Sequence, residues 1–281
     1  MMPPKNASGN QAPQSATYPL RHETVGVLKG DEWIARGVPE MLSVVMPAHN
    51  EAENLPDTIQ ALHQALLADG QQFEILVVND NSSDDTPAVL AAMMKDLPEL
   101  QFVDNSPPNG YGHAVRKGLE SFRGDSVIIV MADGSDDPKD VVAFHHKLRE
   151  GYDCVFGSRF IREGRLVDYP FHKLIMNRMG NLFIQMLFWL PYNDVTNAFK
   201  CYRRHVIAGL HPLLSHHFNL TVELPLKALV RGYSYTVLPN AWYNRKKGIS
   251  KLLIREMGSR YLFIILYCFL EKWLSRGDYR R

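Results

Sequence analysis

Three clusters of polar and acidic residues could carry chemistry, because each directly follows a short apolar run. They occupy residues 47–51 (PAHNE), 79–84 (NDNSSD) and 132–138 (ADGSDDP). Carboxylate oxygens suit a hard cation such as Mg²⁺ or Mn²⁺, which in turn binds phosphate oxygens. Helix capping is the alternative for Asp84 and for Asp136 or Asp137. Capping does not account for all three clusters, so we expect a site for a metal ion and phosphate.

Two further segments point to phosphate. Residues 109–118 (NGYGHAVRKG) are similar to a glycine-rich phosphate loop, but they lack both the GxGxxG order and a GK[ST] ending. Within this segment His113 is expected to form local hydrogen bonds rather than to act as a base. Residues 245–251 (RKKGISK) are basic, and Arg and Lys form charge-assisted hydrogen bonds to phosphate. A solvated basic turn is the alternative for this second segment.

The apolar runs predict the elements that position these residues. Strands are expected at 42–46, 73–78, 101–103, 126–131 and 154–157, with helices at 52–69, from 84, at 112–122 and after Pro138. Strands that are apolar throughout and alternate with helices indicate a parallel sheet covered on both faces. The polar clusters would then meet beyond the carboxyl ends of the strands, where open parallel sheets bind ligands.

The pattern changes after about residue 160. Helices are expected at 173–190, 219–231 and 252–274, and a strand at 197–202. The first and last of these helices combine aromatic and aliphatic residues with Arg and Lys. That combination favours helices lying in the headgroup plane of a membrane, with core packing as the alternative.

Composition narrows the class of protein. Hydrophobic residues make up 46% and charged residues 22% of 281, which excludes a wholly disordered chain. The chain carries 31 Lys or Arg and 30 Asp or Glu, so its total charge does not indicate a nucleic-acid partner. Residues 241–281 alone hold ten Lys or Arg and three Asp or Glu, which suggests contact with an anionic surface or ligand.

Cysteine content and hydropathy suggest a cytosolic location. The three cysteines are far apart and form no CxxC pair, which argues against a disulfide scaffold or a cysteine zinc site. The first twenty residues contain no apolar run, and no stretch reaches the roughly 18–20 apolar residues of a membrane span. We therefore expect a protein that folds in the cytosol without a signal peptide.

Taken together, the motifs resemble a known family. The segments PAHNE, VNDNSSDDT, NGYGHAVRKG, MADGSDDP, GSRF, DVTNAFKCYRR and RKKGISK have the order and spacing of inverting family 2 glycosyltransferases. More narrowly, they are similar to dolichyl- or polyprenyl-phosphate mannose (or glucose) synthases. The resemblance covers about residues 41–255. It implies an α/β GT-A (Rossmann-like) fold with a mostly parallel sheet, helices on both faces and C-terminal amphipathic helices.

The composition of the first residues, the pattern of the last helix and the resemblance together divide the chain. Residues 1–40 would be a disordered tail and linker, 41–240 the GT-A catalytic domain, and 241–281 a basic phosphate-binding loop with a membrane-surface helix. The implied ligands are a nucleotide sugar, Mg²⁺ or Mn²⁺, and a polyprenyl-phosphate lipid. No nucleic acid is implied, and the oligomeric state and any membrane-protein partner stay open.

Carried over position by position, the resemblance assigns residues to the donor. Asp133 matches the metal-binding Asp, whereas Met131 stands where a first Asp is usual and Ser135 where Gln or His is usual. Because a thioether is a poor ligand for these ions, Asp133 would need help from donor phosphates and from Asp136 or Asp137. The donor-binding residues would be Pro47, His49, Glu51, Val78, Asp80, Ala132, Asp133, Ser135, Arg245 and Lys251.

The acceptor phosphate and the catalytic step would use further positions. The resemblance assigns the acceptor phosphate to Arg159, Lys173, Asn177, Lys247 and Ser250. It assigns catalysis to Asp133, Arg159, Arg245 and Lys251.

Three functions are therefore considered. The first is inverting transfer of a hexose from GDP-mannose or a UDP-hexose to a polyprenyl phosphate, on the cytosolic face of a membrane. The second keeps the family but uses a saccharide or other hydroxyl acceptor, which needs a base such as Asp194, Glu223 or the 136–137 pair. The third is a nucleotide-sugar-binding protein that has lost activity, suggested by Met131.

Overall fold

The computed structural model describes residues 40–244, 254–275 and 277–279, with the side chains of 254–257 excepted. The strands are β1 Met41–Ala48, β2 Gln72–Asn79, β3 Leu100–Asp104, β4 Ser126–Ile129, β5 Cys154–Ser158, β6 Arg165–Val167, β7 Lys200–Arg203, β8 Tyr235–Pro239 and β9 Ala241–Tyr243. The helices are α2 Leu55–Ala68, α3 Thr86–Met93, α4 Tyr111–Ser121, α5 Pro138–Arg149, α6 Phe171–Phe188, α7 Arg204–Gly209, α8 Leu220–Val230 and α9 Ile254–Leu274.

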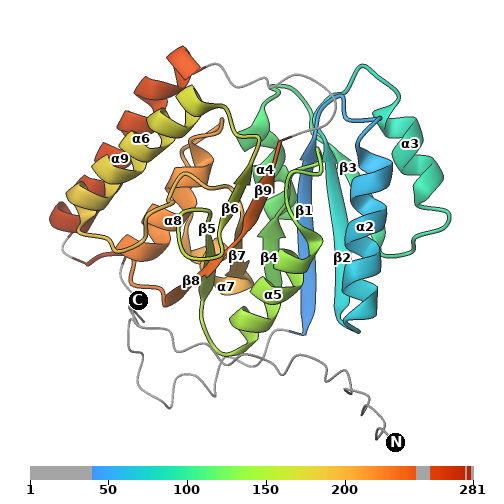
Figure 1. The fold of residues 1–281 in the computed structure, drawn as a ribbon, viewed down its shortest axis with the longest axis horizontal. Helices are drawn as coiled ribbons and strands as arrows, with labels where there is room; N and C mark the ends of the chain where they lie inside the picture. Colours follow the sequence, from blue (N-terminus) through green and yellow to red (C-terminus); the bar gives the residue numbers. More distant parts are fainter. Residues whose placement is uncertain (1–39, 245–253, 276, 280–281) are drawn as a thin grey trace, which may run out of the picture.

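Seven of these strands form one mostly parallel sheet in the order β3-β2-β1-β4-β7-β5-β8. Strand β7 is the exception, because it runs antiparallel to both β4 and β5. A separate pair joins β6 to β9 in parallel (Figure 1). The expected α/β architecture with a mostly parallel sheet is confirmed.

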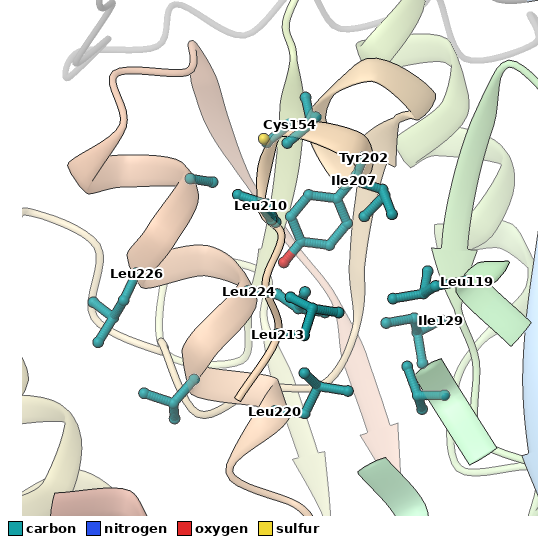
Figure 2. Close-up of a cluster of buried hydrophobic side chains, with 14 of the residues drawn as sticks. Leu119, Ile129, Cys154, Tyr202, Ile207, Leu210, Leu213, Leu220, Leu224 and Leu226 are labelled. Atoms are coloured by element: carbon teal, nitrogen blue, oxygen red, sulfur yellow. The ribbon is translucent and has the colours of Figure 1, made fainter. Parts of the chain in front are cut away.

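Alternation along the central strands divides the core between the two faces of the sheet. In β1, Val45 faces one apolar cluster, whereas Val44 and Met46 face the other. The first cluster is completed by α4, α6, α7, α8 and α9, and the second by α2, α3 and α5. Figure 2 shows part of the first cluster, in which the Tyr202 ring lies among leucines that include Leu210 and Leu224.

Helices α6 and α9 lie side by side at one end of the molecule (Figure 1, yellow and red). The ring of Phe188 meets that of Phe269 edge-on, with their centroids 6.0 Å apart, and Lys272 Nζ donates to the Phe188 carbonyl at 2.8 Å. A buried ion pair between Arg231 and Glu271, 2.7 Å long, ties α9 to the end of α8. The long C-terminal helix is therefore attached to the sheet domain by both apolar and ionic contacts.

The structure differs from the sequence-based elements at several boundaries. The strand expected at 197–202 begins at Lys200, because the Asn197 side chain instead donates to the Gly157 carbonyl at 3.0 Å and closes a loop. The strand expected at 126–131 ends at Ile129, and Met131 already belongs to the following turn. Strands β6, β8 and β9 and helix α7 were not predicted. They are short, between three and six residues, and most mix polar with apolar residues.

Candidate active site

The loops after β1 and β2 are bonded to each other at the carboxyl edge of the sheet. The Asn50 amide donates to Ser82 Oγ at 3.0 Å, and the Ser83 amide donates to Asn50 Oδ1 at 2.7 Å. The Ala52 amide donates to Asp84 Oδ2 at 3.1 Å. These bonds bring together two of the three polar clusters that the sequence singled out, and Asp84 serves as a link between them.

Asp80 holds the glycine-rich segment against this edge. Its carboxylate is buried and accepts from the Asn105 side-chain amide at 2.7 Å and from the Gly110 backbone amide at 2.8 Å. Gly110 has φ +142°, a conformation that favours glycine, and it directly precedes α4. His49 Nδ1 donates to the Asp80 carbonyl at 2.7 Å. Asp80 therefore fixes where α4 begins relative to β1 and β2.

The other residues expected around the nucleobase lie at the ends of β1 and β2 and in the loops that follow β1 and β4. Pro47 and Val78 are register partners on adjacent strands, and both side chains are buried. Glu51 is half-buried, and its Oε2 accepts from the Asn54 side chain at 2.6 Å. Ala132 lies in the core on the α5 side. The structure thus brings all of these positions to one edge, and their contact with a nucleotide stays a prediction.

The third cluster forms the turn between β4 and α5, called the Asp133 turn below, and its three carboxylates have different surroundings. Asp133 is buried, and its Oδ1 accepts from the Ser135 amide at 3.1 Å. Asp136 Oδ2 accepts from the Met131 amide at 2.8 Å. Asp137 is the N-cap of α5, accepting from the Lys139 amide at 3.0 Å. The capping interpretation is therefore correct for Asp137.

Asp136 has an unusual electrostatic environment. Burial is the largest influence, and together with the negative charges of Asp133 and Asp140 it raises the pKa of Asp136 to about 7. The Met131 amide and the Arg159 guanidinium act in the opposite direction. Mutually repelling carboxylates at the end of a central strand are stabilised by a cation.

The side chains at this turn could supply only part of the coordination shell of a divalent metal. Within the described ranges, no group of three or more His, Cys, Asp and Glu side chains is arranged to hold a metal ion. Asp133 offers a hard oxygen, and the neighbouring Ser135 Oγ is buried without a hydrogen-bond partner among the described residues. These residues fit a hard cation that takes its remaining ligands from a bound diphosphate. They do not fit a metal held by the protein alone.

Arg159 lies in a buried ion pair with Asp194. Its backbone amide and Nε donate to Asp194 Oδ2 at 3.0 and 2.8 Å, and its Nη2 donates to Oδ1 at 2.8 Å. Burial alone would lower the pKa of Arg159, but the Asp194 carboxylate raises it above its usual value, so the guanidinium stays charged. The ion pair places a fixed cation at the end of β5, next to the Asp133 turn.

Sequence reasoning missed the residue that supports this ion pair. Lys200 is fully buried, and its Nζ donates to the Val195 carbonyl at 3.0 Å and to the Thr221 carbonyl at 3.3 Å. Burial lowers the pKa of Lys200 to about 7, although the Asp194 carboxylate acts in the opposite direction. The DVTNAFK segment carries this signal, because a Lys flanked by apolar residues in a strand requires carbonyl or carboxylate partners.

Helix α6 is tied to the same loop through amide side chains. Asn177 Nδ2 donates to Thr196 Oγ1 at 2.9 Å, and Asn181 Nδ2 donates to Asn177 Oδ1 at 2.8 Å. Arg178 stacks over the Phe160 ring, 4.4 Å from its centroid. Lys173 lies one turn before Asn177 on this helix and is half-buried. Arg159, Lys173 and Asn177 therefore come from neighbouring segments, and their contact with an acceptor phosphate stays a prediction.

The base candidates for a saccharide acceptor are mostly engaged. Asp194 pairs with Arg159 as described. Glu223 is fully buried, accepts from the Leu214 and Ser215 amides at 2.7 and 2.6 Å, and pairs with Lys227 at 2.6 Å. Both carboxylates therefore hold the fold together, and Asp137 is engaged as a cap.

Strand β9, which directly precedes the basic segment in the sequence, is bonded to the turn between β4 and α5. The Tyr243 amide donates to the Ser135 carbonyl at 2.9 Å, and Trp242 forms an isolated β-bridge with Asp136. Strand β9 was not expected, and it leads directly into the basic segment. Four predicted site residues lie outside the described residues, namely Arg245, Lys247, Ser250 and Lys251.

The outer faces of α6 and α9 expose many large apolar side chains. The most exposed are Phe171 (74%), Met179 (66%), Met186 (61%), Trp189 (86%), Phe263 (61%), Trp273 (59%) and Leu274 (70%). A contiguous patch of this kind marks an interaction surface rather than ordinary solvent-exposed structure. None of the described helices combines the length and hydropathy that a bilayer crossing requires.

Comparison with known proteins places these observations in context. A family model for glycosyl transferase family 2 matches residues 43–210. The polyprenol monophosphomannose synthase of Mycolicibacterium smegmatis is 29% identical over 215 residues, which cover 74% of this chain and 80% of that protein. Glycosyltransferase AglD of Haloferax volcanii is 26% identical over 231 residues, 79% of this chain, but the match spans only 36% of that longer protein.

Among solved structures, glucosyl-3-phosphoglycerate synthase from Mycobacterium tuberculosis shares the fold. Its complex with Mn²⁺, UDP-glucose and phosphoglyceric acid superposes with a TM-score of 0.61 at 15% identity. The match covers 90% of this chain and 86% of that chain. At this identity the likeness concerns the fold, and it agrees with the GT-A expectation.

Proposed function

Because the chain belongs to glycosyltransferase family 2, we propose that it transfers a hexose from a nucleotide sugar to the phosphate of a polyprenyl lipid. The chemistry of the acceptor is what distinguishes this function from saccharide transfer. A lipid phosphate is already an anion near neutral pH, whereas a sugar hydroxyl must lose a proton to a base as it attacks.

The observation that carries the proposal is that Asp194 and Glu223, two of the base candidates for a saccharide acceptor, are both held in buried ion pairs. The Asp194 carboxylate pairs with the buried guanidinium of Arg159, and the Glu223 carboxylate pairs with the buried ammonium of Lys227. Neither can accept a proton without leaving an unpaired buried cation, which is costly. A cation fixed at the end of β5, with further basic residues on the neighbouring α6, suits an anionic acceptor. The relative from M. smegmatis, named for a polyprenol monophosphomannose product, supports the same assignment.

One carboxylate favours a second candidate function. Asp136 has a pKa raised to about 7 and, among the described residues, neither forms an ion pair nor caps a helix. A carboxyl group of this kind suits a general base, so transfer to a saccharide hydroxyl through Asp136 is the second candidate. Under that function Asp136→Asn abolishes turnover, whereas with a phosphate acceptor it weakens turnover only through its effect on donor binding.

The chain's own residues would act mainly by binding and positioning. Asp80 and His49 would hold the nucleotide end of the donor at β1 and β2, and Asp133 with Ser135 would face its diphosphate. A divalent cation bound there would neutralise charge on the departing diphosphate. Arg159, held rigidly by Asp194, would orient the acceptor phosphate for in-line attack on the anomeric carbon, a single displacement that inverts configuration.

The exposed face of α6 and α9 supports action at a membrane surface. Its aromatic and aliphatic side chains would enter the headgroup region, and the exposed Arg178 on α6 would meet anionic lipid. The polyprenyl chain could then stay in the bilayer while its phosphate reaches Arg159. We place this surface on the cytosolic leaflet, where nucleotide sugars are available.

Vesicle sedimentation tests the membrane part of the proposal. The wild-type protein should bind vesicles that contain anionic lipid, and Met179→Glu should weaken that binding by tenfold or more, because a charge is costly to place among lipid tails (~2–3 kcal/mol). Leu67→Glu is the matched control, because Leu67 is 59% exposed but lies on α2, away from this face. Equal vesicle binding by both variants would contradict the assignment of this surface.

A transfer assay tests the acceptor. Purified protein is incubated with Mg²⁺ or Mn²⁺, labelled GDP-mannose or a labelled UDP-hexose, and either polyprenyl phosphate or the uncharged polyprenol. Label should enter the organic phase only with the phosphate. No organic-extractable label with any donor would overturn the proposed function.

A further inference from the structure

Two aromatic rings lie against the guanidinium of Arg159. The Arg159 Cζ atom is 5.4 Å from the centroid of the Phe160 ring and 5.9 Å from that of the Tyr169 ring. Both distances are within the range of cation–π attraction, which is stronger where water is excluded, and the Arg159 side chain is only 7% exposed. Asp194 accepts from Nε and Nη2, whereas Nη1 forms no hydrogen bond with the described residues. Nη1 is therefore the guanidinium nitrogen that can donate to a ligand.

The Tyr169 ring reaches Arg159 from another segment of the chain. Phe160 directly follows Arg159, so that its contact is local. Tyr169 lies between β6 and α6, after Asp168, which has φ +55° and bends the chain as it leaves β6. Asp adopts this conformation more readily than most residues do. The contact between Tyr169 and Arg159 therefore depends on the fold around β6.

Trp242 of β9 supports the Tyr169 ring. The two rings meet edge-on, with centroids 4.9 Å apart and planes at 78°, which is a favourable geometry for an aromatic pair. Strand β9 is paired with β6, where Leu166 is the register partner of Trp242. Asp140 of α5 holds the same strand, because its Oδ2 accepts from the Ala241 amide at 2.8 Å. The position of the Tyr169 ring is therefore set by β6, β9 and α5.

Strand β9 also joins this ring to the Asp133 turn. Trp242 forms the isolated bridge with Asp136, and the Tyr243 amide donates to the Ser135 carbonyl at 2.9 Å. One strand thus contacts the turn that faces the donor diphosphate in the proposed function and, through Tyr169, the cation that faces the acceptor. In-line attack requires these two groups in a fixed relation.

The hydrogen bonds from Asp194 leave one motion of the guanidinium open. Two parallel bonds to a carboxylate allow the guanidinium to tilt about the line through the two oxygen atoms. A ring packed against the guanidinium opposes that tilt, and it does so without occupying an N–H group. The Tyr169 ring can therefore fix the direction of Arg159 Nη1 while leaving it available to a ligand.

We propose that Tyr169, supported by Trp242, is a positioning residue that directs Arg159 Nη1 towards the acceptor phosphate. The identity of the acceptor rests on the proposed function, whereas the contact between Tyr169 and Arg159 does not. Tyr169→Leu removes the ring, and Tyr169→Phe keeps it. Tyr152→Leu is the matched control, because the Tyr152 ring also lies against a cation, Lys147 Nζ at 5.6 Å, but before the start of β5 and away from the carboxyl edge.

Arginine side-chain NMR tests the positioning. The Arg159 Nε–H signal is assigned by its loss in Arg159→Lys. Because aromatic rings shift the resonances of nearby protons, Tyr169→Leu and Trp242→Leu should both move this signal. Tyr169→Phe should keep it near its wild-type position, and Tyr152→Leu should leave it unchanged. A signal that Tyr169→Leu does not move would overturn the inference, whatever the acceptor is.

Transfer kinetics at saturating donor connect the contact to the acceptor. Tyr169→Leu should raise the KM for polyprenyl phosphate by about threefold to tenfold, the value of one buried cation–π contact, with unchanged affinity for the donor. Tyr169→Phe and Tyr152→Leu should keep the wild-type KM. An unchanged KM in Tyr169→Leu, or an equal loss of donor affinity, would overturn this inference alone. No transfer to the lipid by the wild-type protein would instead overturn the proposed function, and with it the role of Tyr169 towards a phosphate.

Discussion

Replacing Asp194 with Asn separates a structural carboxylate from a catalytic base. Asp194 is fully buried and accepts three hydrogen bonds from Arg159, between 2.8 and 3.0 Å long. Its carboxylate also acts on the buried ammonium of Lys200, raising the pKa of that group against the effect of burial. One anion therefore compensates two buried cations, and the amide of Asn would compensate neither.

The expected loss of stability is large. Removing one partner of a buried ion pair costs about 3–5 kcal/mol, because the remaining charge stays buried without compensation. That is a substantial part of the roughly 5–15 kcal/mol that stabilises a typical folded domain. In a protein of this size it corresponds to a fall of about 10 °C in melting temperature.

Urea unfolding and thermal melting of Asp194→Asn measure this loss directly. Asp137→Asn is the matched control, because Asn caps a helix as well as Asp does and the cap of α5 should survive. The control should unfold as the wild-type protein does. An Asp194→Asn protein with wild-type stability and no turnover would refute the reasoning, and it would make Asp194 the base that a saccharide acceptor requires.

Three further predictions concern other parts of the site and fold. Asp133→Asn should lower turnover by roughly a hundredfold with little change in melting temperature, because metal-assisted charge stabilisation is worth several kcal/mol. Near-normal activity with unchanged Mn²⁺ dependence would contradict the assignment of Asp133 to the metal. Asp137→Ala should lower the free energy of unfolding by about 1 kcal/mol through loss of the α5 cap and should leave donor affinity unchanged. Weaker metal binding by this variant would instead show that Asp137 is a metal ligand. Burial lowers the pKa of His145 from 6.5 to about 4, so the unfolded chain binds this proton more readily and stability should fall as pH drops from 6.5 towards 4. His145→Gln should lack this part of the pH dependence, and an unchanged slope would show that other groups cause it.

The strands and the edge where ligands bind could be predicted because their signals are local. Apolar runs such as 126–131 indicate a buried strand, although β4 itself ends at Ile129, before the polar residues begin. Strand β9 could not be predicted in this way. It consists of Ala241–Tyr243 and exists because β6 and the Asp133 turn offer it hydrogen-bond partners from distant parts of the chain.

Which charged residues pair with each other also could not be predicted from the local sequence. Arg159 and Asp194 are 35 residues apart, and only the fold shows that the base candidate is the counter-ion of the proposed acceptor-binding Arg. The surroundings of Tyr111 could not be predicted for a related reason. The glycine-rich segment shows a tight backbone approach, but its Tyr stacks on Phe218, which comes from another segment.

A competition assay tests the acceptor most directly. Wild-type protein is incubated with one labelled nucleotide sugar, a divalent metal, polyprenyl phosphate in vesicles and an equal concentration of a saccharide acceptor, and the label is followed into organic and aqueous products. Transfer to a phosphate acceptor predicts label in the organic phase as a single glycosyl-phosphate lipid of inverted anomeric configuration, with no labelled saccharide. Label accumulating in an elongated saccharide, with none in the lipid, would contradict it.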